Sequence, residues 1–225
     1  MHVLDNPVWH ALTGPHETVA ERRFGASRYV PDVAAFAAVP DDPVSSTWDD
    51  LRDLVGPGGV AVLFVRPAAV PDRWEEVFRI PTSQMVAGDV DAAPAPDAAL
   101  LSTDDVPEML DLVGRTHPGP FERRTIELGD YLGVRDEAGT LVAMAGMRMH
   151  PPGFTEISAV CTDEHVRGRG LATVLVRDLV GRIRDRGETP MLHVMTTNVT
   201  AISVYLRLGF TVRREQDVIG LRAPE

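Results

Sequence analysis

The stretch Arg167-Gly168-Arg169-Gly170 constrains this chain more than any other, because it separates a strand-like run from a helix-like run. The strand-like run covers residues 156–162, and the helix-like run covers residues 172–186. The first backbone N–H groups of a helix have no partner within the helix, and they carry partial positive charge. Glycines let a ligand approach those amides, and arginines add charge that can contact phosphate oxygens. The stretch therefore predicts an anion site, most simply for a diphosphate.

Two other phosphate-binding motifs fit this stretch poorly. A P-loop requires a lysine, and the chain contains none. A dinucleotide-binding fingerprint requires a third glycine at the position where the chain has Thr173. A Gly-Arg-Gly sequence alone is weak evidence, because it also occurs in plain surface turns with solvated arginines.

The sequence around this turn indicates which phosphate-bearing ligand it would bind. The run from Arg167 to Ala172 resembles the acyl-CoA diphosphate motif of the GNAT N-acetyltransferase superfamily. A second block, residues 198–210, resembles the closing helix of that superfamily and the Gly-Phe pair that follows it. The sequence Glu156-Ile157-Ser158 is similar to the glycine N-acyltransferase-like branch. The resemblance covers roughly residues 98–214 and is weak or absent before them.

This resemblance implies an α/β fold with a GNAT-like mixed central sheet flanked by helices. The hydrophobic pattern agrees with that order of elements. It predicts strands at residues 98–101, 130–136, 141–149, 156–162, 191–196 and 210–214, and helices at residues 103–113, 172–186 and 198–209.

Residues 1–90 carry no motif with an assignable chemistry. Their pattern predicts a helix over residues 47–55 and buried strands over residues 59–65 and 79–86. We interpret this segment as a smaller N-terminal αβ domain, a degenerate half-copy of the same fold. The Pro- and Ala-rich residues 91–97 indicate a linker to a catalytic domain at residues 98–225. Because the first segment has no diphosphate motif, we expect one acyl-CoA site per chain.

The resemblance also implies a set of residues that bind acetyl-CoA, the cosubstrate. In the family, backbone groups of the strand before the motif hold the pantetheine arm, commonly beside a β-bulge whose free N–H polarises the thioester carbonyl. Carried over to this chain, the binding residues are Val160, Cys161, Thr162, Arg167, Gly168, Arg169, Gly170, Leu171, Ala172, Thr173 and Asn198. We reject an acyl-enzyme on the cysteine, because a buried strand cysteine is normally inert.

Two side chains are predicted to be catalytic. Tyr205 lies two helical turns after Asn198, so both face the same side, and a phenol with a pKa of about 10 has a proton to donate to the leaving thiolate. Glu156 is the general-base candidate, acting directly or through water. A core tyrosine and a solvated glutamate are the structural alternatives. His193, on the neighbouring strand, is a second candidate for the base.

Bulk properties exclude several classes of function. The net charge is −11, and residues 1–98 hold 15 acidic residues against seven arginines, which argues against a nucleic-acid or anionic-membrane partner. The chain has no long apolar run and no signal-peptide pattern, and its single cysteine cannot form an internal disulfide, so we expect a cytoplasmic protein. The histidines at positions 2, 10 and 16 lack metal-ligand spacing, so we expect no metal.

The sequence therefore predicts an enzyme, an acyl-CoA-dependent N-acyltransferase. It would transfer acetyl from acetyl-CoA to the amine of a small molecule by direct attack in a ternary complex. The alternative is a non-catalytic acyl-CoA-binding sensor or scaffold, and a third reading is a purely structural domain. The sequence does not identify the amine, the acyl chain length or the oligomeric state, and a homodimer is compatible with it.

Overall fold

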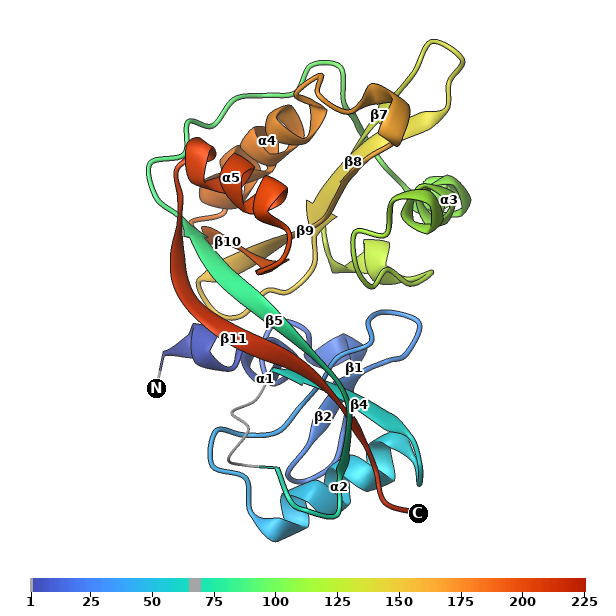
Figure 1. Ribbon diagram of the computed structural model, residues 1–225, viewed down its shortest axis with the longest axis vertical. Coiled ribbons are helices and arrows are strands. Elements are labelled where there is room, and N and C mark those ends of the chain that lie inside the picture. Colours follow the sequence, from blue (N-terminus) through green and yellow to red (C-terminus); the bar gives the residue numbers. More distant parts are fainter. Residues whose placement is uncertain (1, 65–69) are drawn as a thin grey trace.

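The computed structural model describes residues 2–64 and 70–225, which form two lobes joined by two long strands (Figure 1). The N-terminal lobe contains α1 (Pro7–Leu12), β1 (Ala20–Arg22), β2 (Ser27–Tyr29), β3 (Ala37–Ala38), α2 (Ser45–Val55) and β4 (Val60–Phe64). The other lobe contains β6 (Ala99–Leu100), α3 (Val106–Thr116), β7 (Tyr131–Arg135), β8 (Leu141–Met147), β9 (Phe154–Thr162), α4 (Leu171–Asp185), β10 (Thr189–Met195) and α5 (Val199–Leu208). The joining strands are β5 (Glu75–Ala87) and β11 (Phe210–Arg222).

One mixed sheet of eight strands runs through both lobes, in the order β4-β11-β5-β10-β9-β8-β7-β6. Strands β9 and β10 are parallel, and the other neighbouring pairs are antiparallel. Strands β1, β2 and β3 form a separate small sheet. The predicted α/β class, with a mixed sheet flanked by helices, is confirmed.

The two lobes exchange strands. In one lobe, β9 leads through α4 to the parallel strand β10; in the other, β3 leads through α2 to β4, beside the parallel bridge Phe36–Val62. The strand that follows β4 along the chain, β5, pairs with β10 of the other lobe, while β11 pairs with β4. The interpretation of the N-terminal segment as a half-copy of the fold stays a prediction.

Segment 1–90 therefore contributes an inner strand to the sheet of the C-terminal lobe. Strand β5 lies between β10 and β11, and it pairs with β11 over most of their length. The division into domains at residues 91–97 stays a prediction, and the structure adds that the two sides share one sheet.

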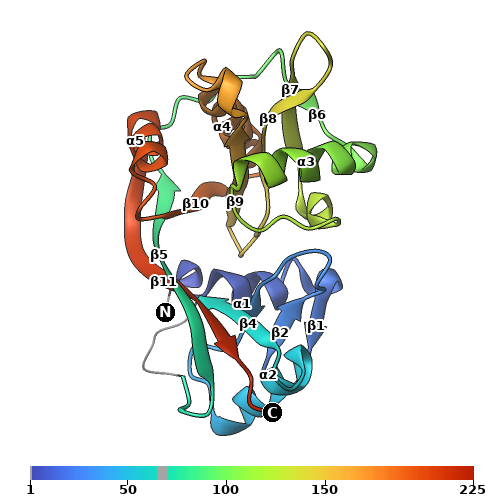
Figure 2. The same ribbon diagram turned by 45° about the vertical axis from the view of Figure 1, so that its right-hand side comes forward.

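Helices cover both faces of the sheet in the C-terminal lobe (Figures 1 and 2). On one face, α4 and α5 pack over a core that includes Leu175, Leu179 and Phe210. On the other face, α3 packs Met109 and Leu112 against the sheet. These apolar stripes at helical spacing are buried because that removes their surface from water.

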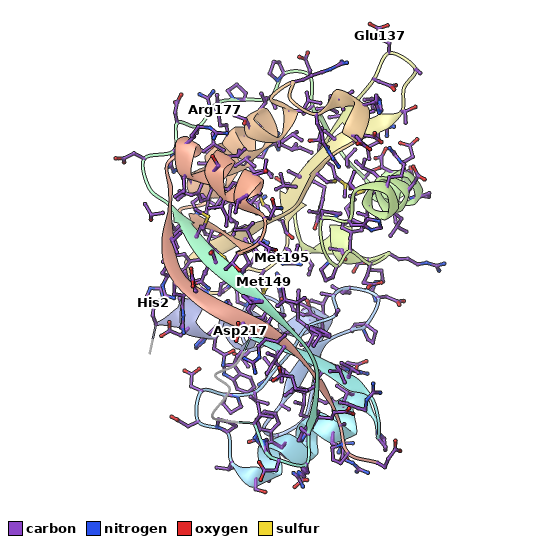
Figure 3. The ribbon with its side chains drawn as sticks, viewed as in Figure 1. His2, Glu137, Met149, Arg177, Met195 and Asp217 are labelled. Atoms are coloured by element: carbon purple, nitrogen blue, oxygen red, sulfur yellow. The ribbon has the colours of Figure 1, made fainter. Side chains whose placement is uncertain are left out.

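A separate apolar cluster joins the lobes. Leu4, Val8 and Tyr29 of the N-terminal lobe pack against Met149 and Met191. Figure 3 labels Met149 at the level where the lobes meet. The lobes therefore share a core as well as a sheet.

The segment that we predicted to be a linker lies along α4. The Arg177 guanidinium contacts Asp91, and Arg184 donates to the carbonyl of Val90 at 2.6 Å. The backbone N–H of Ala95 donates to the buried Asp178 carboxylate at 2.7 Å. These arginines, which include Arg177 in Figure 3, thus have structural roles on α4.

Several element boundaries differ from the sequence prediction by a few residues, and the strand predicted over 79–86 begins earlier, at Glu75. The helix predicted from residue 47 begins at Ser45, and the hydroxyl of Thr47 accepts from the Val44 N–H at 3.2 Å within its first turn. The last strand, predicted over residues 210–214, continues to Arg222, with a register shift between Val212 and Arg214. The predicted end of the strand 59–65 lies outside the described residues, and the strand is described to Phe64.

Candidate active site

The predicted diphosphate site is a turn that leads from β9 into α4. Gly168 and Gly170 both have φ of +79°, a left-handed conformation that favours glycine, and Gly170 is the N-cap of α4. A Cβ added at either glycine would meet no atom within 4 Å, so the space above the turn is open. The first turn of α4, from Leu171 to Thr173, thus presents its N-terminal amides next to an open surface.

The two arginines of the turn differ in their partners. Nε of Arg167 donates to the carbonyl of Thr162 at 3.3 Å, which ties the turn to the end of β9. Arg169 has no ion pair among the described residues, and its side chain lies in an exposed position. Neither guanidinium pairs with a carboxylate among the described residues, and together with the helix amides this arrangement suits a phosphate group.

Strand β9 has a bulge before that turn. Ala159 has φ of +51°, and the pairing of β9 with β8 shifts register between Ser158 and Cys161. A bulge frees a backbone group from the ladder. The structure thus has a bulge beside Val160, Cys161 and Thr162, the strand residues that we expect to contact the pantetheine arm.

Strands β9 and β10 pair only over their first few residues and then separate. Their ladder covers Thr189 to Met191 on β10 and ends at Glu156 on β9, although β9 continues to Thr162. The edge of β9 that carries the bulge is therefore not paired with β10. Such an unpaired parallel edge, leading to a helix N-terminus, can accept an extended ligand arm.

Cys161 on this strand is buried, and burial raises the pKa of its thiol. A thiol with a raised pKa is a poor nucleophile. The expectation of no acyl-enzyme on Cys161 agrees with this environment.

The closing helix positions the two residues predicted on it. Asn198 caps α5, and its Oδ1 accepts from the Ala201 N–H at 3.1 Å. Tyr205 lies on the face of α5 that packs against the core, and its ring contacts Phe210 edge-on with centroids 5.9 Å apart. Burial raises the pKa of Tyr205 to about 12, so the phenol stays protonated at neutral pH.

Glu156 lies in a different environment from the solvated strand edge that its position suggested. Its side chain is buried, and Arg148 holds it with Nε to Oε2 at 2.8 Å and Nη2 to Oε1 at 2.9 Å. Burial alone would raise the pKa of Glu156, but the Arg148 charge and the hydrogen bond from His193 outweigh burial and lower it to about 2. A carboxylate with this pKa is too weak a base to deprotonate an ammonium group near pH 7. The environment of Glu156 therefore favours a positioning role.

His193 is oriented by Glu156 and by two glutamines. Its Nδ1 is 2.8 Å from Glu156 Oε1, and its Nε2 is 3.0 Å from the amide nitrogen of Gln84 and 3.1 Å from that of Gln216. The Oε1 of Gln84 accepts from Arg213, which identifies the Gln84 nitrogen as the group facing the imidazole. Amide donors at Nε2 assign a proton to Nδ1, and the lone pair of Nε2 already accepts hydrogen bonds.

No group of three or more His, Cys, Asp or Glu residues that could hold a metal ion occurs in the described part of the chain. Over residues 2–64 and 70–225, no helix is long and apolar enough to cross a membrane.

A solved structure from Novosphingobium aromaticivorans, assigned as an acetyltransferase of the GNAT family, matches this fold over its whole length. The two chains are 36% identical, each is covered completely, and the TM-score is 0.90. The chain belongs to the GNAT family of acetyltransferases. A GCN5-related N-acetyltransferase from Kribbella flavida has the same fold, with 17% identity, a TM-score of 0.64, and coverage of 96% of this chain and 93% of that one.

Sequence comparison places the family signal in the C-terminal lobe. A family model described as FR47-like protein matches residues 131–219. A mycothiol acetyltransferase from Mycobacterium sp. (strain JLS) is 32% identical over 89 residues, which are 37% of this chain. A second one, from Mycobacterium ulcerans, is 31% identical over 87 residues. This chain spans only about 30% of the length of these relatives. The similarity to the glycine N-acyltransferase-like branch stays a prediction.

Several residues of this GNAT site had no signal in the sequence. Arg148 follows β8 as one of many arginines, and only the register of β8 and β9 brings it to Glu156. Gln84 comes from β5, 109 residues before His193. The strand exchange between the lobes brings Gln84 to His193, and no local sequence pattern could have predicted this contact.

Proposed function

We propose that this protein is an N-acetyltransferase that transfers the acetyl group of acetyl-CoA to the amine of a small molecule. The observation that carries the proposal is the continuous path from the bulge at Ala159 to the glycine turn and the N-terminus of α4. The mixed sheet, the helix cap at Gly170 and the unpaired edge of β9 all support it. Membership of the GNAT family, whose acetyltransferases use acetyl-CoA, points to the same donor.

The residues present fit acetyl-CoA. The α4 amides and Arg169 would hold the diphosphate, because they combine partial and full positive charge beside open space. The backbone of Val160, Cys161 and Thr162 would hold the pantetheine arm. Bound acetyl-CoA would supply a thioester, an acyl group that an amine can attack directly.

The side chains divide into two roles in this proposal. Tyr205 would protonate the thiolate as it leaves, since its phenol is neutral and its hydroxyl has no hydrogen-bond partner among the described residues. A bulge N–H near Ala159 would stabilise negative charge on the carbonyl oxygen during attack. Glu156 would fix the orientation of His193 and strand β9, and the amine would lose its proton to solvent.

The test is thiol release from acetyl-CoA with a broad panel of small amines, followed over a pH series. We expect saturable release with at least one amine, and a rate that rises with pH as the free amine becomes neutral. Acetyl-CoA binding without release for any amine would favour the sensor or scaffold alternative.

A further inference from the structure

Tyr131 carries a buried hydroxyl that has no partner. The residue is fully enclosed, and its hydroxyl makes no hydrogen bond to any described residue. An unsatisfied buried hydroxyl destabilises a fold, so its presence requires an explanation. Burial raises the pKa of Tyr131, which keeps the phenol protonated.

The sheet register places Tyr131 beside the bulge of β9. Tyr131 on β7 pairs with Gly146 on β8, and Gly146 pairs with Ser158 on β9. The tyrosine ring lies directly across Gly146, where an added Cβ would come within 2.1 Å of it. Ala159, the bulge residue, belongs to the same packed cluster as Tyr131. The ring of Tyr131, which carries the orphaned hydroxyl, therefore packs beside the strand segment assigned to the thioester.

Phe121 covers Tyr131 on the face of the sheet that α3 occupies. The two rings meet edge-on with centroids 5.5 Å apart. Phe121 comes from the irregular connection after α3, which runs between α3 and the N-terminal lobe (Figures 1 and 2).

The connection that carries Phe121 is weakly attached. Among the described residues, no backbone hydrogen bond holds residues 118–121, and His117 and Gly119 both have positive φ. Phe121 is the only buried side chain between residues 117 and 121. The Phe121 ring is thus the buried contact of residues 117–121 with the cluster, and its displacement breaks no backbone hydrogen bond of residues 118–121.

The side chains that cluster with Phe121 are apolar. They include side chains of α3, β8 and β9: Met109, Leu112, Met144, Ala159 and Cys161. A group that replaced the Phe121 ring would meet apolar atoms and the ring of Tyr131, whose hydroxyl has no hydrogen-bond partner among the described residues. This chemistry suits a ring-sized apolar group that also carries a hydrogen-bonding nitrogen.

We propose that Phe121 occupies the acceptor site of the ligand-free enzyme, and that an arylalkylamine displaces it and hydrogen-bonds to Tyr131. This inference rests on the proposed function and names its substrate class. The Tyr131 oxygen accepts an N–H of the neutral amine, which leaves the nitrogen lone pair free. The nitrogen attacks the thioester carbon, the C–N bond forms, the C–S bond breaks, and the thiolate leaves with a proton from Tyr205. The nitrogen loses its extra proton to solvent, and Tyr131 keeps its own.

The kinetic test compares ring-bearing amines (benzylamine, phenethylamine and tyramine) with polar amines (ethanolamine and glycinamide), each with acetyl-CoA. We expect kcat/KM for the ring-bearing amines to be higher by about tenfold or more, as differences in apolar contact allow. Tyr131→Phe should lower kcat/KM for phenethylamine by about 10–100-fold, since the hydrogen bond is lost, with KM for acetyl-CoA unchanged. The Tm of this variant should be unchanged or higher, because the orphaned hydroxyl is gone.

Two further variants separate this role from a structural one. Tyr29→Phe is the matched control: Tyr29 is equally buried, but its hydroxyl pairs with His16 Nδ1 at 2.8 Å, so its loss should lower Tm and leave kcat/KM nearly unchanged. Phe121→Ala should lower KM for phenethylamine, because no ring has to be displaced. A preference for the polar amines, or wild-type kinetics in Tyr131→Phe, would overturn the proposal while leaving the acetyltransferase function intact.

A readout without turnover tests the same site. Protein that carries para-fluorophenylalanine at position 121 should show a fluorine NMR resonance that moves toward that of a solvent-exposed ring when phenethylamine and CoA are added, and ethanolamine should cause no such change. This change without any thiol release would support the site and contradict acetyl transfer. An unchanged resonance at saturating phenethylamine would overturn the proposed displacement of Phe121.

Discussion

Arg148 and Glu156 form a buried two-point ion pair, with Nε–Oε2 and Nη2–Oε1 distances of 2.8 and 2.9 Å. Glu156 is on β9 and Arg148 follows β8, so the pair joins adjacent strands next to the bulge. The guanidinium also lies over the ring of Phe36 from the N-terminal lobe, 4.8 Å from its centroid. This pair therefore ties both lobes to the strand that is expected to hold the thioester.

Replacing Glu156 with glutamine should destabilise the fold strongly. The change leaves the Arg148 charge buried without a counter-ion, which costs about 3–5 kcal/mol. Urea unfolding of the wild type and Glu156→Gln measures the difference. Glu75→Gln is the control, since Glu75 is exposed and pairs with Arg222 at 3.2 Å, and it should cost less than about 1 kcal/mol. Equal losses in the two variants would contradict a buried pair.

The stability of the protein should fall between pH 6.5 and 4 because of His16. Burial, and next the charge of the adjacent His150, lower the pKa of His16 from its ordinary 6.5 to about 4. Because the pKa of His16 is lower in the folded state, the unfolded chain binds the proton more tightly. The contribution of His16 to the free energy of unfolding is therefore complete above pH 6.5 and is lost as the pH falls to 4. The pKa difference corresponds to about 3 kcal/mol. Unfolding free energies at pH 7 and 4.5 should differ less in His16→Gln than in the wild type, and an identical pH dependence would refute the assignment.

Removing the Tyr205 hydroxyl should slow catalysis without weakening donor binding. The phenol is the proposed proton donor to the thiolate, and such donors contribute about 10²–10⁴-fold. Tyr205→Phe should therefore lower kcat by at least about 100-fold and leave the Kd for acetyl-CoA nearly unchanged. Steady-state kinetics and calorimetry measure both quantities. If Tyr205→Phe kept the wild-type kcat, Tyr205 would have only a structural role in the core.

Two glycine substitutions test the packing beside the bulge. Gly146→Ala forces a Cβ to within 2.1 Å of the Tyr131 ring, and such overpacking costs about 1–3 kcal/mol or more. Gly114→Ala is the matched control on α3, where nothing lies within 4 Å, and alanine should stabilise that helix by up to about 1 kcal/mol. In thermal unfolding, Gly146→Ala should lower the Tm relative to the wild type, and Gly114→Ala should raise it. A tolerated Gly146→Ala would show that Tyr131 does not lie across β8 as described.

The sequence predicted the parts of the fold and site that depend on local pattern. The turn from Arg167 to Gly170, the helix after it and the cap at Asn198 are set by neighbouring residues, so motif and periodicity were sufficient. The ion pair of Glu156, the contact of His193 with Gln84 and the ring of Tyr131 over Gly146 depend on strand register. The position of β5 between β10 and β11 depends on strand exchange, which leaves no local pattern.

Calorimetric titration of acetyl-CoA into the wild type and Gly170→Glu tests the central claim most directly. Gly187→Glu is the control, because Gly187 also has a positive φ and open space but follows the opposite end of α4. The account predicts saturable binding near one acetyl-CoA per chain for the wild type and Gly187→Glu, and loss of binding in Gly170→Glu. No binding to the wild type, or equal binding by Gly170→Glu, would contradict the donor site at the N-terminus of α4.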